Sequence, residues 1–431
     1  MYFLNTCYLA QRPMEQGYRP TGERDIKTTD LESTPFKSTR EALSSGTLEE
    51  DMTAIGQEID STNTRTVQLV KLLSVLGPDV PEISRKLGQF KESVRYRYKE
   101  KIVNRGIAVQ AAVDHEKLGL RRIMAIADVA EPYRGYAHAI FTAMHELCYV
   151  VGFAKTLVGG EYVINFSIPE EHVHEVRDLF RGLEEKGMFT RLEVYEFDWF
   201  RTVPMKAEHY DFDTGRWDFD WQGRGPEDFR AAAGVPSERG RFDGVDLLIV
   251  KELQIDANKS LKEISDKLNV NYKKLAWHYS SHVIARKLVS GYTVNWMGTR
   301  YDYTLEKALH RRHRYFAVDL FVKELGELET MTLRRELNRL PFIWGEAGGG
   351  NYFAEFAFPV DNVVEALQFI GNATRGLKDR TSIYPIDQSE AARFTIAYQL
   401  YDPTKKQWKL DGENMLSKFE QLMVQIKTGV S

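Results

Sequence analysis

The sequence predicts an α+β protein with two winged helix-turn-helix domains, each followed by a ferredoxin-like βαββαβ domain. Three observations lead to this fold class. Part of the chain returns about 180 residues later, each copy opens with three short helices at helix-turn-helix spacing, and each copy continues with strands and helices in the order βαββαβ. At 431 residues the chain has room for roughly three or four domains.

The repeat is clearest at the second helix of each copy. The run EISRKL at 82–87 returns as EISDKL at 263–268, an offset of 181 residues. The same offset aligns an apolar stripe on the following helix, with one apolar residue every four positions. The aligned stripes are Val94, Tyr98 and Ile102 in the first copy and Leu275, Tyr279 and Val283 in the second. Self-similarity over so long a period indicates duplication.

Each copy has the pattern of a winged helix. Asp79 and Glu82, like Ser260 and Glu263, have the spacing of a capping box, which predicts where the second helix starts. Only about three residues then precede the third helix, as in helix-turn-helix motifs. The predicted helices are 64–76, 81–87 and 91–105 in the first copy and 245–253, 261–268 and 272–287 in the second, with wings at 107–113 and 288–296.

Strands and helices then alternate in both copies. The predicted order βαββαβ runs through 122–129, 133–147, 149–157, 162–168, 170–186 and 190–197, and again through 315–322, 327–339, 342–346, 352–358, 362–375 and 394–401. Both faces of the first strand of each unit are largely apolar, so the face without helices needs a partner. Because the units are tethered, we expect an internal pseudo-dimer. The alternative is two units that each pair with another chain, and a further homodimer would use leftover edges or the C-terminal helix.

These patterns divide the chain into seven segments. They are a disordered leader at 1–63, winged helices at 64–114 and 243–298, ferredoxin-like domains at 115–204 and 299–405, a linker at 205–242 and a C-terminal helix at 406–431. The net charge of −4 is nearly balanced, so any nucleic-acid surface must be local. Two distant cysteines and no run of about eighteen apolar residues predict a cytoplasmic protein with no membrane span.

Motifs around the first wing point to a family. The run VRYRY at 94–98 is followed by Gly106-Ile107 and then by AVDHEKLGL at 112–120. Together they resemble the Lrp/AsnC family of transcription regulators, and Asp246, Ile249, Leu253 and Gly291-Tyr292 are similar to that family's first helix and wing. The resemblance covers about 64–204 and 243–401, although the third helix is one residue longer than usual. It implies DNA binding, pairing through the α+β domain and, often, an amino-acid effector.

The third helix of the first copy is the predicted DNA-reading element. Its basic side chains can neutralise phosphates or take a guanine edge in the major groove of double-stranded DNA. The predicted DNA contacts are Lys91, Arg95, Tyr96, Arg97, Lys99 and Lys101, with a weaker set of Lys273, Lys274 and His278 in the second copy. His278 and His282 also have metal-compatible spacing, but no third ligand lies near them in sequence, so no metal is expected.

The glycine-rich turns of the two βαββαβ units are the predicted place for a small-molecule effector. The residues there are Gly159, Gly160 and Glu161 in the first unit and Gly349, Gly350 and Asn351 in the second. They carry less than the full ligand signature of the Lrp/AsnC family.

No catalytic motif or cofactor fingerprint is present, which predicts a regulator that is not an enzyme and has no cofactor. Two alternatives stay open. Sirohaem decarboxylases resemble Lrp/AsnC proteins and use two such units, with His and Arg near the hairpin between the second and third strands; this chain has Phe342 to Glu346 there, without His. The other alternative is a scaffold that binds regulators and has lost DNA binding.

Overall fold

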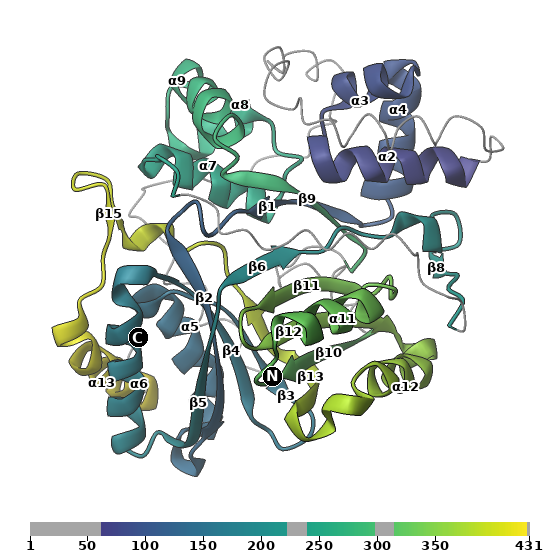
Figure 1. Cartoon of the computed structure of the whole chain (residues 1–431). Coiled ribbons are helices and arrows are strands. Elements are labelled where there is room, and N and C mark those ends of the chain that lie inside the picture. The colour runs from purple at the N-terminus through teal and green to yellow at the C-terminus, as the bar shows by residue number, and fades with distance from the viewer. Residues whose placement is uncertain (1–61, 222–238, 298–313, 429–431) are drawn as a thin grey trace.

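The structure is a computed structural model that describes residues 62–221, 239–297 and 314–428. The predicted leader at 1–63 lies almost entirely outside these residues. Two winged helices sit together at one end of the molecule, and a β-barrel with helices on its outside forms the rest (Figure 1). The fold class predicted from the sequence is confirmed.

The first winged helix comprises α2 (Thr62–Leu76), α3 (Val80–Leu87) and α4 (Lys91–Tyr98), and α4 continues as the π-helical turn η1 (Lys99–Val103). Asp79 caps α3 by accepting a hydrogen bond from the Glu82 amide at 3.1 Å, as the capping spacing predicts. The π turn accommodates one additional residue, which accounts for the unusually long third helix.

The second winged helix repeats this arrangement. It comprises α7 (Gly244–Ile255), α8 (Leu261–Leu268) and α9 (Tyr272–His278), and α9 continues as the π turn η5 (Tyr279–Ile284). Ser260 and Glu263 form the predicted capping box at the start of α8. Both third helices therefore change from α to π geometry within one residue of the same aligned position.

The wings differ from the prediction. Strand β1 (Ala108–Val113) follows the first winged helix and pairs antiparallel with β9 (Val289–Asn295), which follows the second. The expectation of two separate wings is therefore wrong, because each copy supplies one strand of a shared two-stranded ribbon. β1 packs against α7 and β9 against α2, so each strand contacts the winged helix of the other copy.

Both ferredoxin-like units have the predicted element order. The first contains β2 (Leu120–Val129), α5 (Ala137–Cys148), β3 (Val150–Thr156), β4 (Tyr162–Pro169), α6 (Val173–Glu185) and β5 (Phe189–Phe197). The second contains β10 (Tyr315–Val322), α11 (Glu327–Leu337), β11 (Ile343–Gly348), β12 (Tyr352–Pro359), α12 (Val363–Ala373) and β13 (Thr381–Arg393). The predicted last strand at 394–401 is wrong, because that apolar run contains the short helix η8 (Tyr398–Leu400), while the more polar segment before it forms β13.

The two units share one sheet, in the order β5-β2-β4-β3-β13-β10-β12-β11-β6. Strand β6 (Trp199–Thr202) follows β5 after Asp198 alone, so the two outer strands of this order are successive parts of the chain. The sheet therefore closes into a barrel, with α5 and α6 on one side and α11 and α12 on the other (Figure 1).

Apolar side chains from both units fill the middle of the barrel. Met124 and Ile126 of β2 contact the cluster that contains Phe321 of β10 and Phe353 of β12, and each of the four is at most 1% exposed. Ile123, the neighbour of Met124, belongs instead to the core beneath the helices. The second apolar face of each unit is thus covered by the other unit of the same chain.

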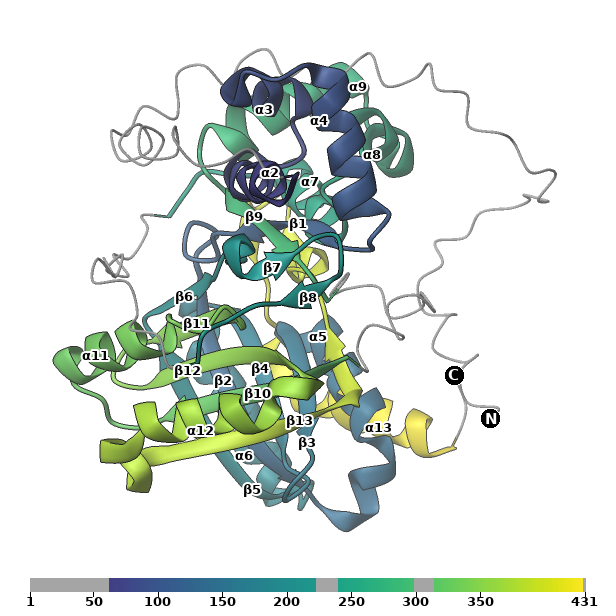
Figure 2. The same ribbon diagram turned by 90° about the vertical axis from the view of Figure 1, so that its right-hand side faces the viewer.

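A short hairpin follows each unit and extends the duplication. The first hairpin is formed by β7 (Tyr210–Asp211) and β8 (Arg216–Trp217), and the second by β14 (Tyr401–Asp402) and β15 (Gln407–Trp408). The first packs near α2, where Asn63 donates a hydrogen bond to the Tyr210 carbonyl at 3.4 Å. Part of the predicted linker is therefore ordered structure. In the other view (Figure 2), this hairpin lies between the winged helices and the barrel.

The last element is α13 (Gly412–Thr428), which packs against α6 and α5. It begins after the second hairpin, which occupies the first residues of the segment expected to be a C-terminal helix. Among the described residues, no helix has the length and apolar character needed to cross a membrane.

Candidate DNA-binding surface and buried ligand site

The outer face of α4 and η1 carries basic and aromatic side chains that are partly or fully exposed. Lys91, Arg95 and Lys99 follow one another at four-residue spacing, which places them along one side of the helix. None of them forms an ion pair with a described residue. Tyr96 is 70% exposed and Phe90, the residue before the helix, is 84% exposed. This surface offers cations and apolar rings to a partner outside the chain.

Two of the predicted DNA contacts already bind within the protein. Arg97 donates a hydrogen bond from Nη1 to Oε1 of Gln89 at 2.7 Å. Lys101 forms an ion pair with Asp213 of the first hairpin, and its side chain is only 19% exposed. Lys101 is therefore withdrawn from the predicted set, because its charge is compensated and turned toward the hairpin.

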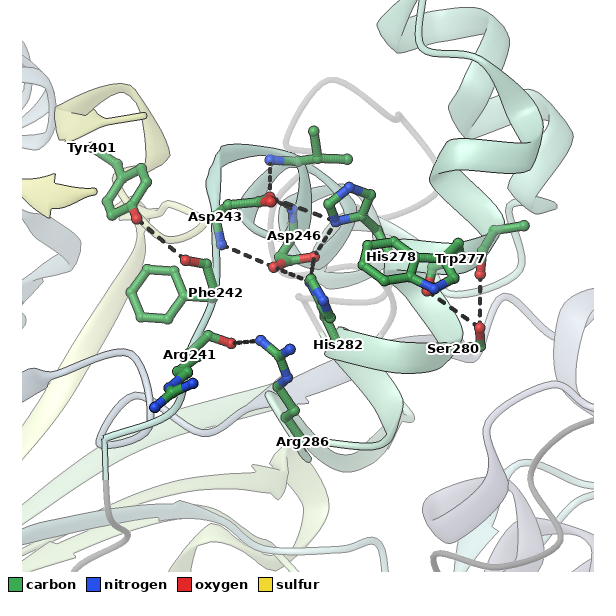
Figure 3. Close-up of polar contacts among 12 residues, drawn as sticks. Arg241, Phe242, Asp243, Asp246, Trp277, His278, Ser280, His282, Arg286 and Tyr401 are labelled. Carbon is green, nitrogen blue, oxygen red and sulfur yellow. Dashed lines mark hydrogen bonds and ion pairs between the residues drawn. The ribbon is translucent and has the colours of Figure 1, made fainter. Parts of the chain in front are cut away.

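The second winged helix presents a smaller basic face. Lys273 and Lys274 are exposed at the start of α9, and Trp277, which aligns with Tyr96, is 54% exposed. His278 is 4% exposed and its Nδ1 lies 2.8 Å from Oδ1 of Asp246 (Figure 3). The prediction that His278 contacts DNA is wrong, because the imidazole is buried against α7.

Both winged helices lie at the same end of the barrel because of the strand directions. All neighbouring strands in the barrel are antiparallel, which makes β2 and β10 parallel to each other. In the chain, β2 follows the first winged helix and β10 follows the second. Both strands therefore start at the end of the barrel that carries the β1–β9 ribbon (Figures 1 and 2). The glycine turn between β3 and β4 lies at the other end of β2, where Tyr162 pairs with Ala127. The turn between β11 and β12 follows Gly348, whose carbonyl accepts a hydrogen bond from the Asp198 amide between β5 and β6 at 2.8 Å.

The glycine turns predicted as an effector site lie apart from the two cavities described next. Gly159, Gly160, Gly349 and Gly350 all have positive φ, which explains why glycine is needed in these tight connections. Glu161 binds Thr156 Oγ1 at 2.9 Å and Arg191 at 3.0 Å, and Asn351 accepts a hydrogen bond from the Glu324 amide. None of the six predicted residues lines either of these cavities, so an effector site at the turns stays a prediction.

A layer of buried charge lies inside the barrel at the end nearer the winged helices. Arg393 of β13 forms an ion pair with Glu355 of β12, whose side chain is fully buried. Asp319 of β10 is 6% exposed, and burial, followed by the charge of Glu355, holds the pKa of its carboxyl well above the ordinary value. The guanidinium of Arg393 also stacks over Trp344 at 4.2 Å from the ring centre.

This layer borders a cavity of about 100 Å³. Asp319, Arg393 and Trp344 line it from the barrel, and Asn295 and Met297 line it from the end of β9. One polar atom of the cavity lining, Oδ1 of Asn165, is buried and has no hydrogen-bond partner among the described residues. Buried polar atoms without partners at a cavity are typical of a ligand site.

A smaller cavity of about 40 Å³ lies beside it, under β1. It is lined by His115, Arg122 and also Arg393, so the two cavities share one guanidinium. His115 Nδ1 lies 2.6 Å from Ser167 Oγ, and burial, aided by the charge of Arg122, lowers the pKa of the imidazole to about 3. The layer thus contains a neutral imidazole beside charged groups.

One sign of this layer is visible in the amino-acid sequence, although the predictions did not use it. Asp319 and Glu355 stand within strands that are otherwise almost entirely apolar, and charged residues are rarely buried unless they are paired. In the first unit, Met124 and Asn165 pair with each other as Asp319 pairs with Glu355, and so hold the matching positions. The charged set therefore belongs to one half of the barrel.

No protein-family model matches the chain, and no curated protein sequence matches it. Among solved structures, the siroheme decarboxylase NirDL is similar over 84% of this chain and 98% of its own, with 10% identity and a TM-score of 0.46. AsnC from E. coli is similar over 32% of this chain and 92% of its own, with 16% identity and a TM-score of 0.25. At these identities the likeness concerns the fold alone.

The comparison nevertheless corrects one prediction. The expectation that the chain is not an enzyme is contradicted, because the two structures that are similar over 84% of the chain are those of a decarboxylase, one of them in complex with an iron-uroporphyrin III analogue. The AsnC-type regulators, including one from Pyrococcus furiosus, match only about a third of the chain.

Proposed function

We propose that this chain binds double-stranded DNA through its first winged helix and binds a small polar ligand inside its barrel. The observation that carries the DNA-binding part is the row of Lys91, Arg95 and Lys99 on the outer face of α4 and η1, with Tyr96 exposed between them. In winged helices the third helix enters the major groove, where such side chains reach phosphates and base edges.

The ligand part of the proposal rests on the buried layer. Asp319 and Arg393 line a cavity of about 100 Å³ and offer it a proton donor and a cation. An ion pair with the buried Glu355 holds Arg393 in place. This volume is below the roughly 300–1,000 Å³ of sites for drug-sized molecules, so it favours a ligand of amino-acid size. Because Asn295 of β9 also lines the cavity, a bound ligand would touch both the barrel and the second winged helix.

DNA binding is tested by selecting sequences from random duplexes and measuring affinity by fluorescence anisotropy at several salt concentrations. The double variant Arg95→Ala/Lys99→Ala should lose about two contacts to phosphates or bases. Each lost base contact should weaken binding by roughly 1–3 kcal/mol, and the affinity should depend less steeply on salt concentration. The matched control is Arg335→Ala/Lys378→Ala, which removes exposed charges from the barrel surface. Equal losses in both variants would refute the assignment to α4.

A second candidate is a decarboxylase acting on an iron tetrapyrrole. The half-buried Arg393 at the cavity favours it, because such substrates carry carboxylates that a guanidinium can bind. Titration with sirohaem separates the two. The proposed small-ligand site predicts no saturable shift of the Soret band. A stoichiometric shift that Arg393→Gln weakens would place the tetrapyrrole in the barrel and overturn the small-ligand proposal.

A further inference from the structure

Four metal-ligating side chains meet in the second winged helix. Asp243 precedes α7, Asp246 lies in its first turn, His278 ends α9 and His282 lies in η5. One ligand atom from each of the four lies within 4.8 Å of all the others (Figure 3). The sequence-based expectation that no third ligand is available is wrong, because folding brings α7 against the third helix.

The buried carboxylate of Asp246 is the centre of this cluster. It is 0% exposed, and the Nδ1 atoms of His278 and His282 lie 2.8 and 2.9 Å from its two oxygens. Oδ1 of Asp243 lies 3.6 Å from Nδ1 of His278. Two imidazole nitrogens and two carboxylates form a donor set that suits zinc and related divalent transition metals.

The distances between the four ligand atoms would fit such an ion after small shifts of the side chains. With metal–ligand bonds of about 2.0–2.1 Å, the ligand atoms of a tetrahedral site lie about 3.3 Å apart. The observed separations of 2.8, 2.9 and 3.6 Å bracket this value. The carboxylates also accept backbone amide bonds at the start of α7, and each has enough lone pairs to cap the helix and bind a metal.

The cluster is not a requirement of the fold, because the first copy lacks it. Arg97 and Lys101 hold the positions of the two histidines there. Thr66 holds that of Asp246, since it precedes the buried Leu69 by three residues as Asp246 precedes the buried Ile249. None of these three side chains is a usual metal ligand, although the first winged helix has the same helices and the same π turn.

We propose that Asp243, Asp246, His278 and His282 bind one divalent transition metal ion, with zinc as the best match. The ion would join the start of α7 to the α-to-π junction of the third helix. Trp277 packs against both imidazoles, at 5.0 and 4.6 Å between ring centres, so the site reaches the exposed face of the same helix. This proposal is independent of what the barrel binds.

Metal content and cobalt spectra test the site in the full chain. After chelator treatment and dialysis, we expect one zinc ion per chain on reloading, and visible absorption of tetrahedral cobalt when Co²⁺ is added instead. Asp246→Asn and His278→Gln should lower the affinity by more than the roughly 10–100-fold typical of lost outer-shell partners. His174→Ala is the matched control, because His174 is exposed on α6.

Two variants that should disturb the fold less test the metal site even if Asp246→Asn does not fold. Asp243→Ser retains a good helix cap, and His282→Gln retains a hydrogen-bonding side chain. Both should weaken cobalt binding while circular dichroism stays unchanged. The absence of stoichiometric zinc in the wild type, or undiminished cobalt binding in all four variants, would overturn the proposal.

Discussion

Gln110 of β1 donates hydrogen bonds from its side-chain amide to the backbone carbonyls of Gln254 and Ile255, at 3.1 and 3.2 Å. These carbonyls end α7, in the winged helix of the other copy. The amide of Ala257 in turn donates to the Val109 carbonyl on the same strand at 2.9 Å. Each winged helix is thus completed by a strand from the other, which makes the pair one folding unit.

Replacing Gln110 with Ala should destabilise both winged helices together. The change leaves buried carbonyls at the end of α7 with fewer donors, at a cost of about 1–3 kcal/mol. Chemical denaturation followed by tryptophan fluorescence measures the loss. Ser290→Ala is the control, because Ser290 also bonds across the ribbon but is exposed. If both variants lose the same free energy of unfolding, the buried contacts of Gln110 contribute no more to stability than the exposed bond of Ser290.

The two DNA-facing helices should contribute unequally to binding. Lys273→Ala/Lys274→Ala should lower the affinity less than Arg95→Ala/Lys99→Ala, because α9 has Ala276 where α4 has Arg95 and a buried His278 where α4 has Arg97. The comparison must use the full chain, since the exchanged strands prevent either winged helix from being complete alone. Equal salt slopes in the two variants would contradict the expected asymmetry.

Asp213→Asn should strengthen nonspecific DNA binding. The substitution removes the partner of Lys101 and leaves an uncompensated cation beside α4. We expect one more released counterion, which steepens the logarithmic salt slope by about 1. The same variant combined with Lys101→Ala should return to the wild-type slope. A slope unchanged by Asp213→Asn would show that Lys101 remains out of reach of DNA.

The free energy of unfolding should fall as the pH rises from about 4 to about 6, because of Asp79. Burial raises the pKa of its carboxyl from 3.8 to about 6. The folded chain therefore holds a proton in this window that the unfolded chain has released, so rising pH favours unfolding until the folded carboxyl has also ionised. Asp79→Asn removes this effect and keeps an acceptor for the helix cap.

We expect the advantage of Asp79→Asn over the wild type to grow by on the order of 1–3 kcal/mol from pH 4 to pH 7. Thermal denaturation of both proteins across this range measures it. Asp266→Asn, an exposed position on the matching helix of the second copy, should show no such trend. Parallel stability curves for wild type and Asp79→Asn would refute the assignment.

Local patterns were sufficient to predict most elements of the fold. The apolar stripe of Val94, Tyr98 and Ile102 is buried as its spacing requires, because helix periodicity and burial follow directly from residue order. The long third helix also had a physical cause, the π turn at η1. At the matching end of the second copy, Lys287 adopts φ +54°, close to the +67° of Gly106, so the same left-handed turn forms without glycine.

Pairings between distant segments could not be predicted in the same way. The ribbon of β1 and β9 joins strands that each resemble half of an ordinary wing, and nothing local distinguishes a hairpin from an exchange. The pairing of Lys101 with Asp213 and of His278 with Asp246 likewise depends on which helices meet. Charge and spacing predicted which side chains could bind something, and tertiary contacts determined which remain accessible.

The closed barrel also has an evolutionary consequence. In a barrel built from two identical chains, every substitution inside it would occur twice, and a new carboxylate would face its own copy. Here Asp319 and Glu355 occur in one half, while Met124 and Asn165 occupy the matching positions in the other. Because the two halves are fused in one chain, each position can be substituted independently of its counterpart. The barrel can therefore bind one asymmetric ligand per chain.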